Sequence, residues 1–557
     1  MNFDPAMTKQ EHIKHHKDGL AVWDDIFRFA KTPSAPIPDD DLLRMRWFGI
    51  YRQKPNDGHF MWRIKLPGGR LTPSQLREIG LLANQYGRGF ADITTRQDIQ
   101  LHWLTIHDFP DALDRIYNRA RLYTDFACGD TPRNITSCPL DGVVKGQIVQ
   151  LGDLVQRLSD MFRDAGAEFS NLPRKFKPAV AACPLHCHLP QINDISTFAV
   201  LRHTARGEQR GLGIMVGGGL SSEPHFAQSL RVFIPDNLVH DLVPPIFRVV
   251  AAIFRDADSL RYKRGHARLK FLVAENGWQW FRDEIERRLG HALEHDDLIV
   301  HPVGAQFTDH MGVGQQLNGL CYVGVPVSCG RWTADQMIAM ADLAQRFAAP
   351  AQADLRLSHK QNLLLLNIPP QQTDQLCREL DTLGLPPHAP LWRHSLVSCT
   401  GKQFCNLAVV ETKDRARAII EYLEEQIQLD VPLMLSVSGC HNSCAQHHIA
   451  DIGLTGIPVV MPDGEKVDGF NVLVGGHLGE NPGVARLIAR KVPAHLVHKV
   501  IASLVRQYIA RRLVAPEGHV EPFRFFASRI DDKKLAQWCM IPEWMPPQSV
   551  APQRITP

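Results

Sequence analysis

The sequence lacks the features of a membrane or secreted protein. No apolar run approaches the roughly 20 residues that a bilayer-spanning helix needs. The N-terminal segment MNFDPAMTKQEHIKHHKDG is polar and charged, without the apolar core of a secretory signal. We therefore expect a cytoplasmic protein with neither a signal nor a membrane span.

A strong charge of one sign is also missing. The 62 lysines and arginines nearly balance the 59 aspartates and glutamates, which leaves a net charge of +3. Domains that bind nucleic acid usually carry a clear basic excess. The balance therefore predicts neither nucleic acid nor a charged membrane surface as a partner.

Motifs for nucleotide cofactors are absent as well. The glycine runs VGGGL and VGGHL match neither GxGxxG nor the phosphate-loop pattern GxxxxGK[ST]. Such runs suit a tight turn or the close approach of backbone to a bulky cofactor. Because the chain has no flavin or nicotinamide motif and no appended ferredoxin domain, any electrons must come from a separate protein.

Four of the 12 cysteines form a ligand pattern. Cys399 and Cys405 lie in SCTGKQFCNLAVVETK, and Cys440 and Cys444 lie in SGCHNSCAQHHIADIG. In a large chain without a signal, cysteines indicate a reducing compartment. Four thiolates can hold an iron–sulfur cube, and a thiolate can also be an axial ligand of a haem-type iron. Structural zinc is the alternative, but zinc sites more often use tighter cysteine pairs, so the spacing favours a cluster.

The chain contains an internal duplication. Three blocks recur in the same order: 69–75 at 330–336, Cys183-x3-Cys187 at Cys440-x3-Cys444, and 211–224 at 469–482. Thr72 with Pro73 is expected to begin a helix in the first copy. The segments ADITTRQDIQLHWL and ADLRLSHKQNLLLL are each expected to form one strand. A site shared between two such halves is the natural place for a large cofactor.

The two copies differ in their cations. Side chains two apart in a strand point to the same face, so Arg63 should share a face with Lys65, and Arg96 with Gln100. At the position that matches Arg63, the second half carries Gly324. Lone cations are usually solvated, but these alternate with strongly apolar neighbours, and buried cations need anions. The first half is therefore predicted to bind anions.

Cysteines also remain in the first half. Cys183 and Cys187 follow Cys128 and Cys138. Matching spacing after a duplication needs only shared ancestry. We therefore expect ordinary buried thiols here instead of a second cluster.

Longer motifs resemble a known family. CTGKQFCNLAVVETK and GCHNSCAQHHIADIGL resemble the cluster motifs of the sirohaem-dependent nitrite and sulfite reductases. FMWRIKLPGGRLT, ADITTRQDIQLHW and NLPRKFK resemble anion- and sirohaem-binding segments of the same family. The similarity covers most of the chain, and the chain is identified as a member of this family.

The resemblance implies the cofactors and the site residues. It implies a [4Fe–4S] cluster bound by Cys399, Cys405, Cys440 and Cys444, with the Cys444 sulfur also bridging to the iron of a sirohaem. The positions that match the cationic substrate pocket of the family are Arg63, Arg133, Lys175 and Lys177. The positions that match contacts with sirohaem and its carboxylates are Arg96, Gln100 and Arg174.

The resemblance also implies a reaction and partners. We expect a monomeric cytoplasmic oxidoreductase that passes six electrons, one at a time, from ferredoxin or a similar donor to a small oxyanion. Each oxygen lost as water needs protons, which lysine can donate but arginine holds too tightly. A non-enzymatic zinc or cluster binding module would explain the cysteines but not the cations of the opposite half.

Two features of the sequence point to different substrates. The CTGxxFCxxAxxETK form of the cluster motif resembles nitrite reductases. Lys177, however, stands where plant and cyanobacterial nitrite reductases carry asparagine, and a second lysine there is the sulfite reductase pattern. Sulfite is larger and partly dianionic near neutral pH, so it benefits more from the added charge. The sequence is interpreted as an assimilatory ferredoxin–nitrite reductase, with ferredoxin–sulfite reductase as the alternative.

The expected fold is of the α+β class, with an internal duplication and pseudo-twofold symmetry. It combines ferredoxin-like half-repeats with two sirohaem- and cluster-binding domains. The expected parts are an N-terminal extension 1–44, half-repeat 45–125, an anion- and sirohaem-side domain 126–305, half-repeat 306–395, and a cluster-side domain 396–557.

Overall fold

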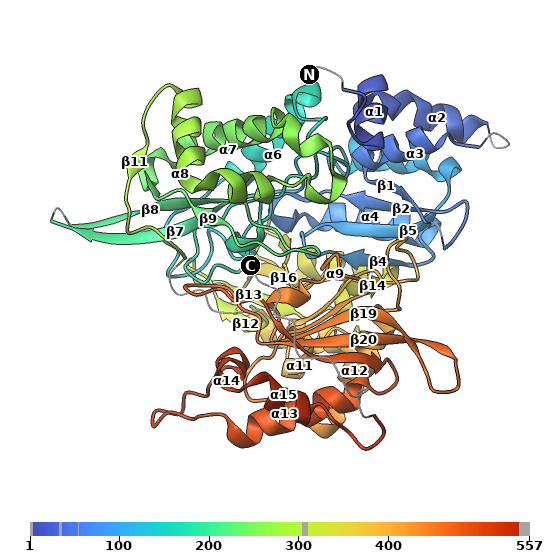
Figure 1. Ribbon diagram of the computed structural model, residues 1–557, viewed down its shortest axis with the longest axis vertical. Helices are drawn as coiled ribbons and strands as arrows, with labels where there is room; N and C mark the ends of the chain where they lie inside the picture. The colour runs from blue at the N-terminus through green and yellow to red at the C-terminus, as the bar shows by residue number, and fades with distance from the viewer. Residues whose placement is uncertain (1–3, 33–35, 54, 206, 303–309, 545–557) are drawn as a thin grey trace.

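The computed structural model describes residues 4–32, 36–53, 55–205, 207–302 and 310–544. The expected boundary between residues 305 and 306 and the outer ends of the first and last parts lie outside the described residues. Figure 1 shows the blue-to-green first half above the yellow-to-red second half, with sheets between outer helical layers. The upper layer holds α6 (Leu154–Asp164), α7 (Val239–Arg255) and α8 (Leu269–Leu289), and the lower one α13 (Val497–Arg511), α14 (Phe523–Arg529) and α15 (Asp532–Trp538).

The two small sheets exchange a strand. The first has the order β1 (Ile50–Arg52), β2 (Phe60–Ile64), β5 (Ile99–Leu104), β4 (Phe90–Ile93) and β14 (Arg331–Thr333). The second has the order β12 (Gly312–Gln315), β13 (Cys321–Val325), β16 (Leu363–Ile368), β15 (Asp354–Leu357) and β3 (Arg70–Leu71). Each sheet thus takes its last strand from the other half, which locks the two copies together.

The repeated GRxTxxQ blocks begin two packed helices, α4 (Pro73–Tyr86) and α9 (Ala334–Phe347). Thr72 is the N-cap of α4, as predicted, and it also forms a capping box with Gln75; Thr333 does the same with Gln336 for α9. A Cβ on Gly80 would lie 2.9 Å from Ile338, so glycine permits the close approach of the two helices.

The expectation of one strand in ADITTRQDIQLHWL is wrong. The segment forms an antiparallel hairpin of β4 and β5, with Ile93 opposite Ile99. Gln97 adopts φ 59°, which turns the chain between the strands. ADLRLSHKQNLLLL forms the matching hairpin of β15 and β16, with Gln361 at φ 63°. Because Arg96 lies in this turn, it does not share a strand face with Gln100.

Buried glutamines at the two turns repeat the same hydrogen bonds across the pseudo-twofold axis. Gln97 Nε2 donates to the Leu357 carbonyl at 2.7 Å, and its Oε1 accepts from the Ser137 amide at 2.9 Å. Gln361 Nε2 donates to the Ile93 carbonyl at 2.8 Å, and its Oε1 accepts from the Ser398 amide at 2.8 Å. Ser137 and Ser398 directly precede Cys138 and Cys399, so the turns fix the same cysteine position in both halves.

The larger sheets also correspond. The first contains β6 (Pro178–Ala179), β7 (Ile195–Thr204), β8 (Gly207–Val216), β9 (Gln228–Ser229), β10 (Val232–Pro235) and β11 (Glu294–His295). The second contains β17 (Leu396–Ser398), β18 (Leu435–Ser438), β19 (Ile452–Val460), β20 (Lys466–Val474) and β21 (Arg486–Pro493). In the first sheet β6 pairs in parallel with β7, the first strand of the long β7–β8 hairpin. In the second sheet β18 pairs in the same way with β19, the first strand of the β19–β20 hairpin. In NLPRKFKPAV only Pro178 and Ala179 are strand, and the preceding residues form an extended loop.

The remaining helices cover the edges of these sheets. At the N-terminus α1 (Lys9–His16), α2 (Trp23–Lys31) and α3 (Asp39–Arg44) lie beside the first small sheet (Figure 1). The others are α5 (Phe109–Asp114), α10 (Thr373–Thr382), α11 (Leu391–His394) and α12 (Lys413–Gln426).

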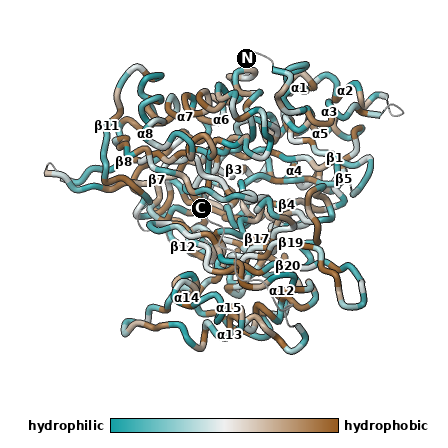
Figure 2. The backbone as a smooth tube through the Cα atoms, viewed as in Figure 1, coloured by the Kyte–Doolittle hydropathy of each residue, from teal (hydrophilic) through white to brown (hydrophobic). Residues whose placement is uncertain are grey.

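One stretch, Asp236–Arg255, is long and apolar enough to cross a membrane by length and composition, with a mean hydropathy of 1.4. It contains α7, which is largely brown in Figure 2. Val243, Phe247, Val250 and Phe254 are fully buried in the first-half core. The burial of these side chains gives α7 the character of a core helix.

Candidate cofactor and substrate site

The fold brings the four predicted ligand cysteines together at the ends of two parallel strands. Cys399 follows β17, and Cys440 comes two residues after β18. Burial, with the nearby Cys444 thiol, raises the pKa of Cys399 to about 12. Burial likewise raises the pKa of Cys405, and Cys444 and Cys440 add to this effect. The ionisation of Cys399 and of Cys405 therefore depends on the neighbouring cysteine sulfurs, as expected for four thiols that lie close together.

The spacing of these sulfurs distinguishes a cluster from a single ion. In the part of the chain that the structure describes, no three of them lie within 4.8 Å of one another. A tetrahedral zinc ion would hold its sulfur ligands about 3.8 Å apart, since Zn–S bonds are about 2.3 Å long. The wider arrangement suits an iron–sulfur cube and argues against the zinc alternative.

Two of the cysteine sulfurs accept hydrogen bonds. The Gly439 amide donates to Cys399 Sγ at 3.1 Å, and Asn442 Nδ2 donates to Cys440 Sγ at 3.4 Å. The ring of Phe404, next to Cys405, stacks on His102 of β5 with centroids 4.0 Å apart. Hydrogen bonds to sulfur tune the potential of a cluster, and the stacked ring holds its loop against the first half.

Cys444 differs from the other three because it is exposed and lines a cavity. Arg96, Lys175, Lys177 and Arg268 line this cavity with Cys444. The cavity is thus shared between the cation-bearing first half and the cysteine-bearing second half.

The other predicted site residues lie around this cavity without lining it. Arg63 and Lys175 both interact electrostatically with Cys444, and Lys175 also interacts with Arg133 and Arg174. Gln100 is opposite Arg63 in the β2–β5 ladder and accepts a weak hydrogen bond from Thr400 at 3.4 Å. These side chains therefore surround the cavity, with Gln100 nearest the cluster loop.

The first-half cations are half-buried, or buried in the case of Arg133, and have no close carboxylate among the described residues. Among the described residues, none of Arg63, Arg96, Arg133, Lys175 and Lys177 has a carboxylate oxygen within 4.0 Å. The Nε atoms of the three arginines are buried and have no hydrogen-bond partner. Burying a charge without a partner is costly, so this set fits a bound polyanion and its anionic substrate.

Burial shifts the pKa values of the two lysines downward. For Lys175 it acts with Arg268 and Arg174 and lowers the pKa to about 7. For Lys177 it acts with Lys175 and Arg268 and holds the pKa well below the usual range. A lysine with a pKa of about 7 can both bind an anion and release a proton near neutral pH.

Arg96 is oriented by the first half alone. Its guanidinium donates to Asn193 Oδ1 at 2.9 Å and to the carbonyl oxygens of Asn134 and Pro178 at 2.5 and 2.9 Å. Burial lowers its pKa to about 10. The neighbouring carboxyl of Asp98 has its pKa raised to about 6 by burial, although Arg63 and Arg96 oppose this shift.

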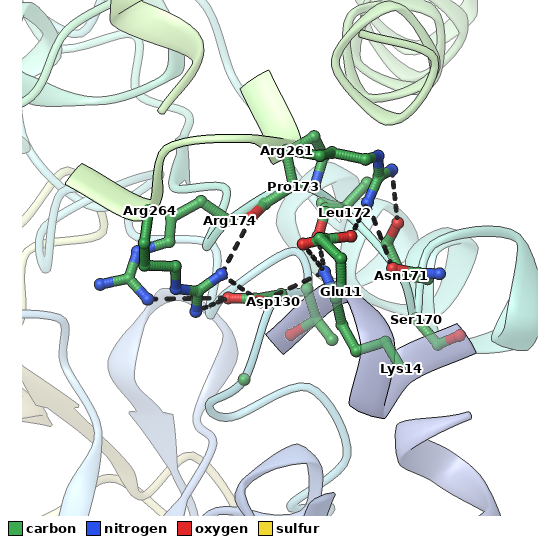
Figure 3. Close-up of polar contacts among 12 residues, drawn as sticks. Glu11, Lys14, Asp130, Ser170, Asn171, Leu172, Pro173, Arg174, Arg261 and Arg264 are labelled. Carbon is green, nitrogen blue, oxygen red and sulfur yellow. Dashed lines mark hydrogen bonds and ion pairs between the residues drawn. The ribbon is translucent and has the colours of Figure 1, made fainter. Parts of the chain in front are cut away.

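A buried ion network positions the lysine-bearing segment (Figure 3). Lys14 of α1 donates to the Leu172 carbonyl at 2.8 Å, and Arg264 donates to the Pro173 carbonyl at 3.1 Å. Both cations also pair with Asp130, at 3.3 and 2.6 Å. Arg174 stands at the edge of this network, 4.0 Å from Asp130. The N-terminal extension thus braces the chain just before Lys175.

Sequence reasoning missed Arg268, which lines the cavity. Its guanidinium donates to both oxygens of Asp194, at 2.8 and 2.9 Å, and Asp194 also accepts the Lys177 amide at 2.8 Å. Asp194 could have been found from the duplication, because Asp451 stands at the matching position of the second half and accepts a hydrogen bond from the Met434 amide at 2.9 Å. No repeat or motif marked Arg268.

This geometry defines a class of protein. Four clustered cysteine sulfurs adjoin a cavity lined by cations, of which only Arg268 has a carboxylate partner among the described residues, and Cys444 belongs to both. Such a site suits an oxidoreductase in which an iron–sulfur cluster delivers electrons to an anionic, metal-containing macrocycle.

Comparisons with known proteins give the family. The nitrite and sulphite reductase 4Fe-4S domain matches residues 128–293 and 393–517, and the nitrite/sulfite reductase ferredoxin-like half domain matches 51–118 and 314–383. The chain belongs to the nitrite and sulfite reductase family. Its cofactors are sirohaem and a [4Fe–4S] cluster, and its fold is the duplicated α+β fold predicted from the sequence.

Some of the relatives are named sulfite reductases and others nitrite reductases. A protein named sulfite reductase [ferredoxin] 2 from Mycolicibacterium paratuberculosis is 34% identical, over 95% of this chain and 96% of its own. The assimilatory ferredoxin-dependent nitrite reductase of Haloferax mediterranei is 32% identical, over 96% and 93%. The solved structure of Mycobacterium tuberculosis NirA superposes with a TM-score of 0.86 at 33% identity, covering 95% of this chain and 97% of that one.

Proposed function

We propose that the protein catalyses the six-electron reduction of a small sulfur or nitrogen oxyanion, with sulfite preferred and nitrite as a second substrate. The observation that carries this proposal is the pair Lys175 and Lys177, half-buried and, among the described residues, without a carboxylate within 4.0 Å, in the cavity that exposes Cys444. Two adjacent ammonium groups in an electron-delivery site require an anion, and the substrate and the carboxylates of sirohaem supply one.

In this proposal Cys399, Cys405, Cys440 and Cys444 would hold the cluster, and Cys444, which lines the cavity, would place the cluster beside the sirohaem. Arg96, Gln100 and Arg174 contact the macrocycle and its carboxylates, while Arg63, Arg133, Lys175 and Lys177 face the substrate. When bound, sirohaem supplies the iron at which the oxyanion is held and reduced. The chain itself supplies positive charge, orientation and protons.

Lys175 is the proposed proton donor. With a pKa of about 7 it is partly protonated at neutral pH and can transfer a proton to an oxygen of the substrate as that oxygen leaves as water. The guanidinium groups of Arg133 and Arg63 stabilise negative charge. Asp98, whose pKa is raised to about 6 by burial, interacts electrostatically with Arg63 and Arg96 and can relay protons toward this side of the cavity.

The substrate preference depends on where each sequence signal lies. The CTG motif, which favours nitrite, surrounds the cluster, whereas Lys177 lines the cavity. A residue that touches substrate affects specificity more directly than one that holds the electron donor. We therefore give Lys177 the greater weight, which favours the larger, more highly charged sulfite.

We further propose ferredoxin as the electron donor and the cytoplasm as the location. Relatives at about a third identity are named ferredoxin-dependent reductases of both kinds. All 12 cysteines are free thiols, as a reducing compartment requires. The role is assimilatory, in that the product retains the sulfur or nitrogen in fully reduced form.

The direct test measures turnover of sulfite and of nitrite by the purified holoenzyme with reduced ferredoxin or methyl viologen. We expect intense Soret and red bands of sirohaem in its absorption spectrum and a higher kcat/KM for sulfite. A colourless protein would contradict the cofactor assignment. A preference for nitrite would contradict the weight given to Lys177 but not the reaction class.

A further inference from the structure

The cysteines of the first half form a compact group with a histidine. The ligand atoms of Cys138, Cys187 and His310 all lie within 4.8 Å of one another. The side chains of Cys183, Cys187 and His310 all lie close enough to the Cys138 thiol to influence its pKa, which is raised from its usual value. Cys183 lies outside this group of three, but its side chain interacts with Cys138, which makes it a candidate for a fourth ligand.

This group occupies the position that the cluster cysteines occupy in the other half. Cys183 and Cys187 match Cys440 and Cys444 in the duplication. Cys138 matches Cys399, because each follows a serine whose amide is bound by the glutamine of the preceding hairpin turn. The fourth ligand differs: Val144 stands in the first half where Cys405 would be repeated, and His310 arrives instead from the segment before β12.

We propose that Cys138, Cys183, Cys187 and His310 bind one zinc ion. Three thiolates and one imidazole are a common ligand set of structural zinc, with Zn–S bonds of about 2.3 Å and Zn–N bonds of about 2.0 Å. The ligand atoms of Cys138, Cys187 and His310, which lie within 4.8 Å of one another, need only small side-chain shifts to reach that geometry, and Cys183 has to move further. A [4Fe–4S] cube needs four ligands set more widely apart, as they are around Cys444.

The surroundings suit a structural site. Cys138, Cys183 and His310 are buried, with 3%, 5% and 8% of their surfaces exposed. Leu140, Ala181, Leu364 and Leu366 pack around the group in a small apolar cluster of their own. Cys187 is half-buried and lines a neighbouring pocket together with His310, so the group is enclosed on the side of the apolar cluster and open toward that pocket.

A disulfide is a poorer explanation of the same contacts. All four first-half cysteines are free, and the Cys138 sulfur has three partners where a disulfide would give it one. Without a metal, the neutral thiols would make only weak hydrogen bonds with one another and with the imidazole of His310. Zinc binding instead displaces the thiol protons and gives each sulfur and the histidine nitrogen a strong bond.

The zinc ion would stabilise the loop that orients the sirohaem pocket. Cys183 and Cys187 lie at the start of the loop that carries Gln191 and Asn193. Gln191 exchanges two hydrogen bonds with Gly479 of the second half, at 2.8 and 2.7 Å. Asn193 accepts the hydrogen bond of Arg96. The metal thus fixes one end of the segment that joins the halves beside the cavity.

Metal analysis of the holoenzyme tests this site. We expect about one zinc per chain by mass spectrometry, and zinc-edge absorption spectra that fit three sulfurs and one nitrogen. Cys183→Ser and His310→Ala should each lower the zinc content at least about tenfold. Cys377→Ser, at another buried cysteine on α10, is the matched control and should keep its zinc.

The outcomes separate this proposal from the catalytic one. The cluster content of His310→Ala, measured as acid-labile sulfide, should stay near that of the control, because all four cluster cysteines lie in the other half. Zinc at background level in the wild-type enzyme would overturn the proposal, as would zinc that remains in both variants. Iron in place of zinc, lost on Cys183→Ser, would overturn the zinc assignment. If Cys183→Ser fails to fold, Cys187→Ser and His310→Ala decide the question.

Discussion

Thr95 in the first half donates a hydrogen bond to the backbone carbonyl of Cys444 in the second half, with an oxygen–oxygen distance of 3.1 Å. Thr95 lies in the β4–β5 turn next to Arg96, which itself is fixed by three hydrogen bonds. The contact therefore sets the distance between a cluster ligand and a cation of the sirohaem pocket. At this point of the fold a residue of the cluster site is in direct contact with the segment that carries an anion-binding arginine.

Loss of a cluster ligand should abolish activity. We expect Cys405→Ser to lose most of its acid-labile sulfide and the corresponding iron, and to show no measurable turnover, because the cluster then has three thiolates. Cys539→Ser, which changes a buried cysteine in the core of the same half, is the control. A Cys405→Ser enzyme with full sulfide content would rule out this residue as a ligand.

Lys175 should control the pH dependence of the rate. Its pKa of about 7 is lowered from the usual value, so the ammonium form that donates protons is present below pH 7 and is lost above it. kcat/KM should therefore fall as the pH rises through about 7. Lys175→Arg keeps the charge but cannot release a proton, so kcat should drop by about 100-fold or more and the fall near pH 7 should disappear. A pH profile of the variant that matches the wild type would exclude Lys175 as donor.

Lys177 should determine the choice between the two anions. Replacing the lysine that lines the cavity by asparagine removes one positive charge, which harms the partly dianionic sulfite more than nitrite. We expect Lys177→Asn to shift the ratio of kcat/KM values toward nitrite by about tenfold, or about 1.4 kcal/mol. Steady-state assays with both anions and methyl viologen measure the ratio. An unchanged ratio would contradict the role of Lys177 in substrate preference.

Asp92 should be a major contributor to stability near the cluster loop. Its buried carboxylate pairs with Arg331 at 2.8 Å and with Lys413 at 3.7 Å, and Arg331 also donates to Gln403 in that loop at 3.0 Å. Burial opposes ionisation, but Lys413, His102 and Arg331 together hold the pKa of Asp92 well below its usual range. Asp92→Ala leaves these cations unpaired and should cost about 3–5 kcal/mol.

Thermal unfolding of the holoenzyme measures this loss as a lower Tm. Asp335→Ala is the control, since Asp335 lies on the exposed side of α9. Because the Asp92 carboxylate loses its contribution as it is protonated, the difference between the wild type and Asp92→Ala should also shrink in strong acid. Equal Tm values for both proteins at neutral pH would contradict the assignment.

The N-terminal extension should matter for the active site. Lys14 is 4% exposed and pairs with Glu11 at 2.6 Å and with Asp130 at 3.3 Å while it holds the Leu172 carbonyl. Lys14→Met should therefore lower Tm and reduce sirohaem occupancy, because the segment before Lys175 loses its brace. Lys9→Met, at an exposed position of the same helix, should change neither. Full occupancy in Lys14→Met would show that the extension is not needed to position that segment.

Much of the fold could be read from the chain because the information is local or repeated. The capping boxes at Thr72 and Thr333 follow from residues three positions apart, and the duplication from recurring blocks. The hairpin turns were missed because Gln97 and Gln361 adopt a left-handed conformation that alternating polarity does not reveal. The exchanged strands β3 and β14 carry no local signal at all, since their partners lie in the other half.

The sequence by itself determined the duplication, the family, the four clustered cysteines and the cationic character of one half. Each of these depends on residue identity and on short spacings along the chain. Only the tertiary structure decided which side chains share a space: Arg268 with Lys177, Lys14 with the lysine segment, and His310 with Cys138. The reason is physical. Sulfur positions suited to a cube or to a single ion, and cations left without anions, result from the packing of elements hundreds of residues apart in the chain.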